Sequence, residues 1–205
     1  MKTYQLVLLL LISIQMNAQS NWKDFWKQSA PIKRWIMLHP FKAKKAQLIS
    51  LKAIKVNDSI SQTYLLDGDK FGGQVDVFRH AYWMATLLKE IGKCASLSLG
   101  RAYERSNRKS FRKSRRKGEI SLYDKPSRKM DLFNNKVGSK FTYRKKIDGK
   151  KGLIFQIVNA ITNGELKILK KDVLGNYVTC KGAVIPKNEL IFWKNKKCLV
   201  SSNLQ

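Results

Sequence analysis

The stretch QVDVFRHAYWMATLLKEIG at residues 74–92 carries the strongest periodic pattern in the chain. Apolar residues recur in it every three or four positions, at Val77, Ala81, Met84, Leu88 and Ile91. That spacing places them on one face of a helix, and glycine commonly follows the last helical residue. We therefore predict a helix that ends at Gly92 and packs its apolar face into a core.

The same spacing predicts further helices on both sides of this stretch, at residues 21–38, 42–63, 94–106, 126–142 and 153–163. We interpret the cationic run RKSFRKSRRK at 108–117 as a solvated helix end that leads into a loop. In the last forty residues, ELKILKK and YVTCKGAVI predict two short strands around a turn. The expected fold class is mainly α, with a compact helical domain followed by a small β-containing C-terminal appendage.

The beginning of the chain has the layout of a secretory signal peptide. Residues 1–18 contain an early lysine, a short apolar run and a small residue, Ala18, at a candidate cleavage point. We expect three parts: a signal peptide at 1–18, a helical domain at 19–163 and a β-hairpin appendage at 164–205. The mature chain would then be exported to the periplasm or the outside of the cell, with no transmembrane segment.

The expected export decides how the three cysteines are interpreted. An oxidising compartment permits disulfides, and we expect Cys180 to pair with Cys198. Two free thiols packed as small apolar groups are the alternative. Cys94 lies in an apolar run, and we place it in the core. The chain has no CxxC motif and no Cys/His cluster, which argues against a structural zinc site.

The chain is strongly basic, with 41 Lys and Arg, 14 Asp and Glu and a formal net charge of +27. Residues 101–151 hold 19 Lys and Arg against five Asp and Glu. Such a field attracts an anionic surface or a polyanion. A solvated basic face without a specific partner explains the same run. P-loop, GxSxG, HExxH and Rossmann fingerprints are all missing from the sequence, so it supports none of those enzyme classes.

One candidate site residue lies inside the predicted helix at 74–91. His80 follows Asp76 by four residues, so imidazole and carboxylate share a helix face. A carboxylate in that position can orient the ring and raise its basicity. Met84 and Leu87 flank His80, which places it at the border of the core. A buried structural network is the alternative to a catalytic role.

Two further candidates lie later in the chain. In MDLFNNKVG at 130–138, polar residues and a glycine fall on one continuous helical face, at Asp131, Asn134, Asn135 and Gly138. Polar groups beside an apolar stripe must find partners or burial becomes costly. Glu104, in RAYERS, is an acid among arginines. Glu104 either belongs to a functional site or forms a surface ion pair that contributes little to stability.

Together these segments resemble a bacterial domain family of unknown function whose members often follow signal peptides. The stretches that carry the resemblance are HPFKAKKA at 39–46, GGQVDVFRHAYWMA at 72–85, RAYE at 101–104 and MDLFNNKVG at 130–138. The family pattern is an N-A-F-R-H-A-x-W-like helix, a later A-H-E and M-D-L-x-N-N-x-x-G. It implies that seven residues converge in space: Arg79, His80, Trp83, Glu104, Asp131, Asn134 and Asn135.

The chain departs from the family pattern at two places. Asp76 and Val77 stand where the family often has Asn and Ala, and Tyr103 stands where A-H-E has its histidine. A phenol, with an ordinary pKa of about 10, is a poor base at neutral pH. The departure at Tyr103 therefore weakens an enzymatic interpretation for this member.

Two interpretations remain open. In the first, the protein is a hydrolase-like enzyme, active or degenerate, with His80 as general base oriented by Asp76. Glu104 and Asp131 would act as an acid or hold a divalent metal, the one cofactor that the residue set suggests. The substrate would be bound by the remaining polar and aromatic candidates, Arg79, Trp83, Tyr103, Asn134 and Asn135. In the second, the protein is a cationic binding module for envelope polyanions or nucleic acid, without catalysis.

Overall fold

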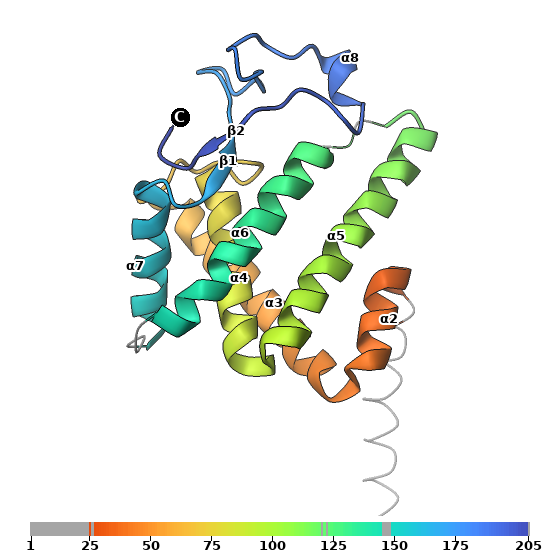
Figure 1. Cartoon of the computed structure of the whole chain (residues 1–205), viewed down its shortest axis with the longest axis vertical. Coiled ribbons are helices and arrows are strands. Elements are labelled where there is room, and N and C mark those ends of the chain that lie inside the picture. Colours follow the sequence, from red (N-terminus) through yellow and green to blue (C-terminus); the bar gives the residue numbers. More distant parts are fainter. Residues whose placement is uncertain (1–24, 26, 120, 122, 145–148, 205) are drawn as a thin grey trace, which may run out of the picture.

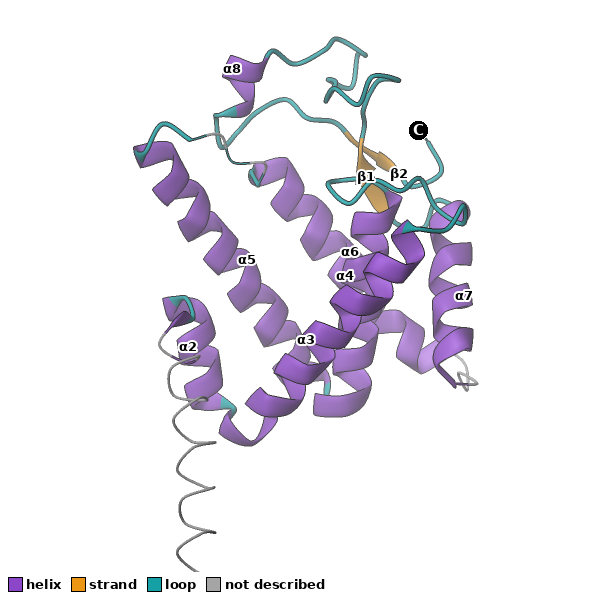
Figure 2. Ribbon diagram, turned by 180° about the vertical axis from the view of Figure 1, so that it is seen from behind, coloured by secondary structure: helices purple, strands orange, loops and turns teal. Residues whose placement is uncertain are grey.

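The computed structural model describes residues 25, 27–119, 121, 123–144 and 149–204. Helix α4 (Gln74–Ile91) lies at its centre and packs against α3 (Pro40–Ser61), α5 (Lys93–Arg116), α6 (Lys125–Arg144) and α7 (Gly149–Thr162). The shorter α2 (Ala30–Leu38) lies against α5 and α3 (Figures 1 and 2). A two-stranded sheet and the short α8 (Lys187–Leu190) lie beyond one end of these helices. The mainly α fold class is confirmed, with a small sheet near the C-terminus.

The predicted helix at 74–91 becomes α4, which is buried on nearly every side. Its fully buried residues include Val75, Phe78, Ala81 and Met84, each with no exposed surface. An α-helix surrounded by neighbours needs apolar residues around most of its circumference, and this sequence supplies them. The few polar side chains of α4 must therefore find partners inside the protein.

Helices α4 and α6 approach each other closely at Gly138. A Cβ atom built on Gly138 would lie 2.6 Å from the Cα and the carbonyl oxygen of Ala81. Only a residue without a side chain fits between these two backbones. The glycine in the MDLFNNKVG motif therefore sets the distance between the two helices that carry His80 and Asp131.

Helix α5 is longer than the sequence pattern indicated. It runs without a break from Lys93 to Arg116, so the helix expected at 94–106 continues through the cationic run, which leads into a loop as expected. Arg and Lys are good helix formers, and cations in the last turn interact favourably with the helix dipole. The helix ends just before Gly118, whose φ of 73° lies in the left-handed region. The cationic run is therefore a rigid face of α5.

The C-terminal strands pair differently from the expected hairpin. Strand β1 (Lys167–Leu169) is antiparallel to β2 (Leu199–Ser201). The expected partner, YVTCKGAVI, reaches the first arm only through an isolated bridge between Lys171 and Tyr177. The carboxylate of Asp172 accepts hydrogen bonds from the backbone N–H groups of Leu174 and Asn176, which stabilises the tight turn that joins the two arms.

The predicted disulfide between Cys180 and Cys198 is confirmed, with a Cα–Cα distance of 4.9 Å. It ties the second arm of the appendage to the segment that leads into β2. The placement of Cys94 in the core is wrong, because the structure leaves it exposed as a free thiol. Cys94 lies in the first turn of α5, on a side of the helix that does not face the core.

The expected signal peptide at 1–18 lies outside the described residues. The division into parts at residues 18 and 163 therefore stays a prediction. Among the helices of the described ranges, none combines the length and the apolar character needed to cross a membrane. His39 stands between α2 and α3, at the C-cap position of the first and the N-cap position of the second.

Candidate functional site

Three neighbouring helices bring His80, Glu104 and Asp131 together. One nitrogen or oxygen atom from each side chain lies within 4.8 Å of the other two. The three residues are 5%, 1% and 5% exposed, so bulk water does not solvate their polar atoms. We call this group the His80 cluster. A buried group of one imidazole and two carboxylates requires protons or a cation among its members.

The imidazole of His80 is held by Asn135 from α6. Its Nδ1 lies 3.3 Å from Asn135 Oδ1, and an amide oxygen can only accept, so we assign the ring proton to Nδ1. Burial, and after it the charge of Arg79, lowers the pKa of His80 to about 4. The ring is therefore neutral at physiological pH, and its Nε2 is an acceptor that lies 3.2 Å from both Arg79 Nη2 and Asp131 Oδ1.

Asp76 is not the group that orients the ring. Its nearest carboxylate oxygen lies 3.9 Å from His80 Nε2, which is beyond hydrogen-bond distance. Asp76 instead pairs with the guanidinium of Arg79 and accepts a 2.9 Å hydrogen bond from the backbone N–H of Gly72. The ion pair neutralises Arg79, whose Nη2 lies 3.2 Å from His80 Nε2. Arg79, with a side chain 36% exposed, is the most solvent-accessible of these residues.

Asp131 faces the imidazole without a hydrogen bond between them. Asp131 Oδ1 lies 3.2 Å from His80 Nε2, but both atoms are acceptors in the assigned tautomer. Asp131 Oδ1 has no hydrogen-bond partner within the described part of the chain. Burial, and after it the charges of Glu104 and Asp76, raises the pKa of Asp131 well above its ordinary value. A proton or a cation must lie between the two acceptors for this arrangement to be stable.

Glu104 is held by a residue that sequence reasoning did not select. The hydroxyl of Tyr123 donates a short hydrogen bond to Glu104 Oε2, while Oε1 is buried without a partner in the described structure. Burial raises the pKa of Glu104 to about 7, although the Tyr123 hydrogen bond opposes the shift. Burial and Glu104 also raise the pKa of Tyr123, so the phenol stays protonated and remains a donor. The sequence offered one indication for Tyr123, because it and Phe111 are the aromatic residues near the cationic run.

Asn134 lies next to Asn135 in sequence but serves another purpose. Its amide nitrogen donates to the carbonyl of Lys167 at 2.8 Å, and its amide oxygen accepts from the Lys167 N–H at 3.0 Å. These two bonds fasten β1 to α6 as a neighbouring strand would. Asn134 is therefore a packing residue of the appendage and lies outside the His80 cluster.

Trp83 and Tyr103 point away from the cluster. The indole N–H of Trp83 donates to Ser50 on α3, and the Tyr103 ring packs edge-on against Trp83 with centroids 5.6 Å apart. Tyr103 is 44% exposed. Both rings line a mostly apolar groove between α2, α3 and α5. The structure thus separates Tyr103 from its neighbour Glu104, because successive residues on a helix face different directions.

The cluster has the donor set of a divalent cation site. One imidazole nitrogen and two carboxylate oxygens converge, and each carboxyl has one oxygen without a hydrogen-bond partner among the described residues, Glu104 Oε1 and Asp131 Oδ1. Mixed imidazole and carboxylate ligands suit Zn²⁺ and Mn²⁺. Asn135 adds a buried amide nitrogen, Nδ2, that has no acceptor among the described residues. The site therefore offers oxygens for a cation and a donor for an anionic or water ligand beside it.

Comparison with known proteins gives one family match. A family model described as "Domain of unknown function (DUF6973)" matches residues 33–165. This range contains every residue of the His80 cluster as well as Tyr123 and Asn135. No curated protein and no solved structure matches the chain.

Proposed function

Because this chain belongs to the DUF6973 family, whose description assigns no function, we propose its activity from the site itself: metal-dependent hydrolysis at the His80 cluster. The observation that supports the proposal is the convergence of His80, Glu104 and Asp131, two of whose buried oxygens have no hydrogen-bond partner in the described part of the chain. A packing network satisfies its buried polar groups. Three ligand atoms around a common centre with unsatisfied oxygens instead fit a cation site.

The charge of the site favours a divalent ion. Glu104 and Asp131 contribute two negative charges when both are ionised, and Asp76 neutralises Arg79 through their ion pair. A divalent cation would balance the two carboxylates and remove the unfavourable burial of their charges. Three protein ligands also leave coordination positions free for water and substrate, as in catalytic metal sites.

The residues around the centre have distinct roles in this proposal. A bound cation would supply an activated water at neutral pH. His80, Glu104 and Asp131 hold the cation, and Asn135 fixes the His80 tautomer through Oδ1. The free Nδ2 of Asn135 can donate to the attacking oxygen. Arg79, the accessible residue, is placed to donate to the negative oxygen that develops on a carbonyl or phosphoryl group during attack.

A titration of the purified protein tests the cation site. After treatment with chelator and its removal, Zn²⁺ or Mn²⁺ is added in a calorimeter, and we expect one cation per chain. Glu104→Gln and Asp131→Asn should each weaken binding by more than about 100-fold, since even the loss of an outer partner costs 10–100-fold. Glu119→Gln is the matched control, because Glu119 is exposed and pairs with Lys117.

Two results of that titration would contradict the proposal. Wild-type protein that binds no cation would make the cluster a packing network. Equal weakening by Glu119→Gln and Glu104→Gln would place the cation elsewhere. Hydrolysis of nitrophenyl acetate and nitrophenyl phosphate, followed with cation and with chelator, then tests catalysis itself. Binding of a cation without turnover of either substrate would indicate the degenerate form of the site.

Export remains part of the proposal. Residues 1–18 have the signal-peptide layout, and the Cys180–Cys198 bond suits an oxidising compartment. Mass spectrometry of the protein recovered from the periplasm or the medium should give a chain that begins near Gln19. Recovered protein that retains Met1 to Ala18 would contradict cleavage at this point.

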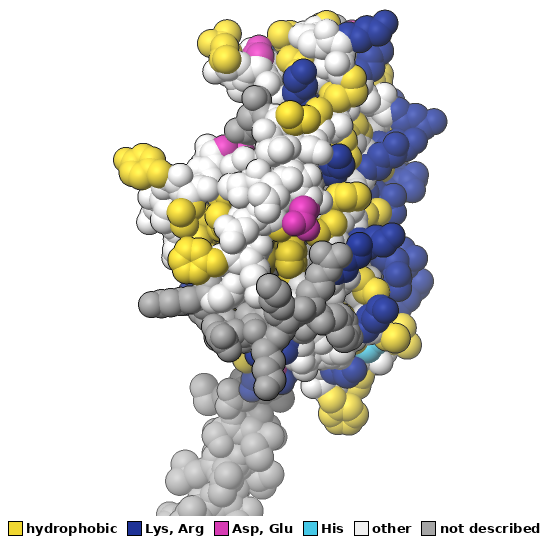
Figure 3. Space-filling model, turned by 60° about the vertical axis from the view of Figure 1, so that its left-hand side comes forward, with side chains coloured by type: hydrophobic (Ala, Val, Ile, Leu, Met, Phe, Trp, Pro, Cys, Tyr) yellow, Lys and Arg dark blue, Asp and Glu magenta, His cyan; other side chains and the backbone are white. Residues whose placement is uncertain are grey.

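The second candidate function, a cationic binding module, is favoured by the distribution of charge. Figure 3 shows Lys and Arg side chains gathered along one edge of the molecule, whereas Asp and Glu are scattered over the face in view. The cationic half of α5 contributes an exposed run at 108–117. A protein that binds polyanions but shows no cation-dependent turnover would fit this candidate.

A further inference from the structure

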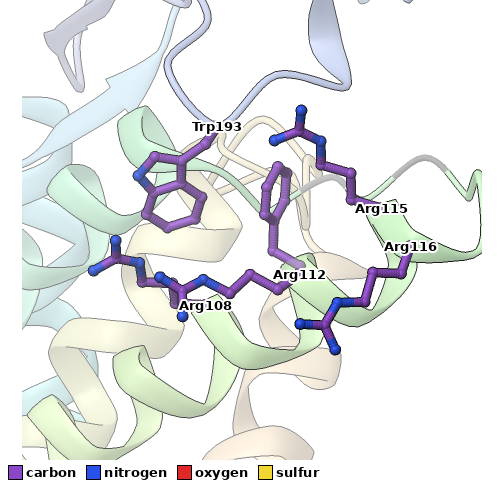
Figure 4. Close-up of a pocket in the computed structure, with 6 residues that line it drawn as sticks. Arg108, Arg112, Arg115, Arg116 and Trp193 are labelled. Atoms are coloured by element: carbon purple, nitrogen blue, oxygen red, sulfur yellow. The ribbon is translucent and has the colours of Figure 1, made fainter.

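A hollow of about 480 Å³ lies between the C-terminal half of α5 and the segment that follows α8. We call it the arginine pocket, and it is lined by Arg108, Phe111, Arg112, Arg115, Arg116 and Trp193. In Figure 4, the side chains of Arg108 and Arg112 lie below Trp193, and Arg115 reaches in from the other side. Its volume is that of a small-molecule site.

The four arginines have no acidic partner. Among the ion pairs of the described residues, none joins a carboxylate to Arg108, Arg112, Arg115 or Arg116. Like charges four residues apart on a helix repel each other, as Arg108 and Arg112 do, and so do Arg112 and Arg116. The pocket thus concentrates positive charge that nothing in the described structure neutralises.

The aromatic wall of the pocket is fixed in place. The Phe111 ring packs edge-on against Trp193 with centroids 5.1 Å apart, and the guanidinium of Arg108 lies 5.4 Å from the Trp193 ring. The carbonyl of Trp193 accepts a 2.9 Å hydrogen bond from the Lys125 N–H at the start of α6. The loop that carries Trp193 is closed by the Cys180–Cys198 disulfide. A basic surface that is only solvated does not require an ordered aromatic wall, whereas a ligand-binding site does.

We propose that the arginine pocket binds a ligand that carries two or more phosphate groups. A guanidinium presents a planar fork of donors that matches phosphate oxygens in a bidentate manner. The stacking of Arg108 on Trp193 leaves the edge of its guanidinium available for such contacts. Several unpartnered guanidiniums in one hollow call for more than one negative charge. The proposal does not rest on the His80 cluster.

The test is a titration of the purified protein with pyrophosphate, with EDTA present so that no cation occupies the His80 cluster. The test variant is Arg112→Gln/Arg115→Gln, which removes two cations from the pocket. The matched control is Lys109→Gln/Lys113→Gln, which removes two exposed cations of the same helix segment that do not line the pocket. Thermal melts of both variants verify that they fold. Sulfate, a single anion, serves as the weaker reference ligand.

We expect wild-type protein to bind pyrophosphate more tightly than sulfate. The pocket variant should lose at least about tenfold in affinity, since each charge-assisted hydrogen bond contributes that much or more. The lysine control should lose less than about twofold, because salt screens charges that do not contact the ligand. Absence of pyrophosphate binding, or an equal loss in both variants, would overturn the proposal.

The phosphates could belong to a soluble compound or to a lipid headgroup, and vesicles separate these sources. Cardiolipin has two phosphate groups, so vesicles of phosphatidylcholine with and without cardiolipin are compared for both variants. Cardiolipin-dependent binding that only the pocket variant loses would assign the headgroup. Vesicle binding that is absent or the same in both variants, together with specific pyrophosphate binding, would assign a soluble ligand.

Discussion

Glu104 and Arg108 are one turn apart on α5, yet their side chains have opposite surroundings. Glu104 is 1% exposed and lies in the His80 cluster, whereas Arg108 is exposed and lines the arginine pocket. The chain has far more cations than anions, but its described buried charges are mostly acids: Asp76, Glu104, Asp124 and Asp131, with Lys197 as the buried lysine. A buried carboxylate that is left unpaired requires a proton or a cation, whereas an exposed arginine remains solvated until an anion arrives.

Tyr123 and Trp193 connect the two regions. The hydroxyl of Tyr123 bonds to Glu104, and its ring centroid lies 6.1 Å from that of Trp193. One site thus takes its shape from helix packing, and the other from a loop laid over a helix. A mutation in the loop should therefore weaken binding at the arginine pocket, and a mutation in the helix packing should weaken binding at the His80 cluster.

Removing the disulfide should have the largest effect and should act on the arginine pocket. Cys180→Ser/Cys198→Ser opens a loop with a sequence separation of 18 residues. We expect the free energy of unfolding to fall by about 3 kcal/mol, because the unfolded chain gains conformational entropy. Urea denaturation measures this loss, with Cys94→Ser as a control that should change stability by less than about 0.5 kcal/mol. Pyrophosphate affinity should fall and Zn²⁺ affinity should not. Equal loss at both sites would show that the loop supports the His80 cluster too.

Gly138→Ala should damage the His80 cluster instead. The new Cβ would lie 2.6 Å from the Ala81 backbone, so α4 and α6 must move apart. We expect a loss of about 2 kcal/mol in the free energy of unfolding, as for other overpacked sites, together with weaker Zn²⁺ binding.

Gly100→Ala is the control for that change. There the new Cβ would lie 2.9 Å from the flexible Cε end of Met84 and 3.4 Å from Asn135 Nδ2, and alanine favours the helix more than glycine does. Urea denaturation should therefore show little change for Gly100→Ala. A Gly138→Ala protein as stable as the wild type would contradict the close approach of the two helices.

Acid should weaken cation binding at the His80 cluster. Burial raises the pKa of Glu104 to about 7, so below that pH the carboxyl carries a proton that a cation must displace. Zn²⁺ affinity should therefore fall by about tenfold per pH unit below 7 for each displaced proton, and should level off above it. Calorimetry between pH 6 and 8 measures the trend. An affinity that stays constant over this range would mean that Glu104 is not a ligand.

The smallest effect is expected at the position where the family pattern has a histidine. Tyr103 is half-exposed and packs against Trp83, away from the point where the three ligand atoms converge. Tyr103→His should change Zn²⁺ affinity by less than about twofold, since an outer residue without contact to a ligand has little influence. Calorimetry again gives the answer. A large gain in affinity would show that the helix face of Tyr103 can turn into the cluster.

The sequence predicted helix positions well where the apolar period was strong. Residues 74–91 and 126–142 became α4 and α6 with shifts of at most two residues, because the buried face of each helix follows from its own spacing. For residues 107–116 the sequence indicated a helix end but not its extent, since a polar helix leaves no apolar period to recognise. The partner of β1 was also missed, because strand pairing depends on where distant parts of the chain meet.

Adjacent residues in the motifs show the limit of sequence reasoning at the site. Asn134 and Asn135 are both polar and both lie beside the core stripe, yet one bonds to β1 and the other to His80. Glu104 and Tyr103 divide in the same way between the cluster and the apolar groove. Neighbours on a helix diverge by about 100°, and only the packing of the surrounding elements decides what each one contacts.

The sequence by itself determined the mainly α fold and the basic character of the chain, because periodicity and composition are local or additive properties, and it left the Cys180–Cys198 pair open against two free thiols. It also singled out His80, Glu104 and Asp131. The tertiary structure decided that these three converge, that Tyr123 and Asn135 hold them, and that Trp193 closes the arginine pocket. Each of these contacts joins residues far apart in the chain, and their distances are fixed by helix packing, such as the close approach at Gly138.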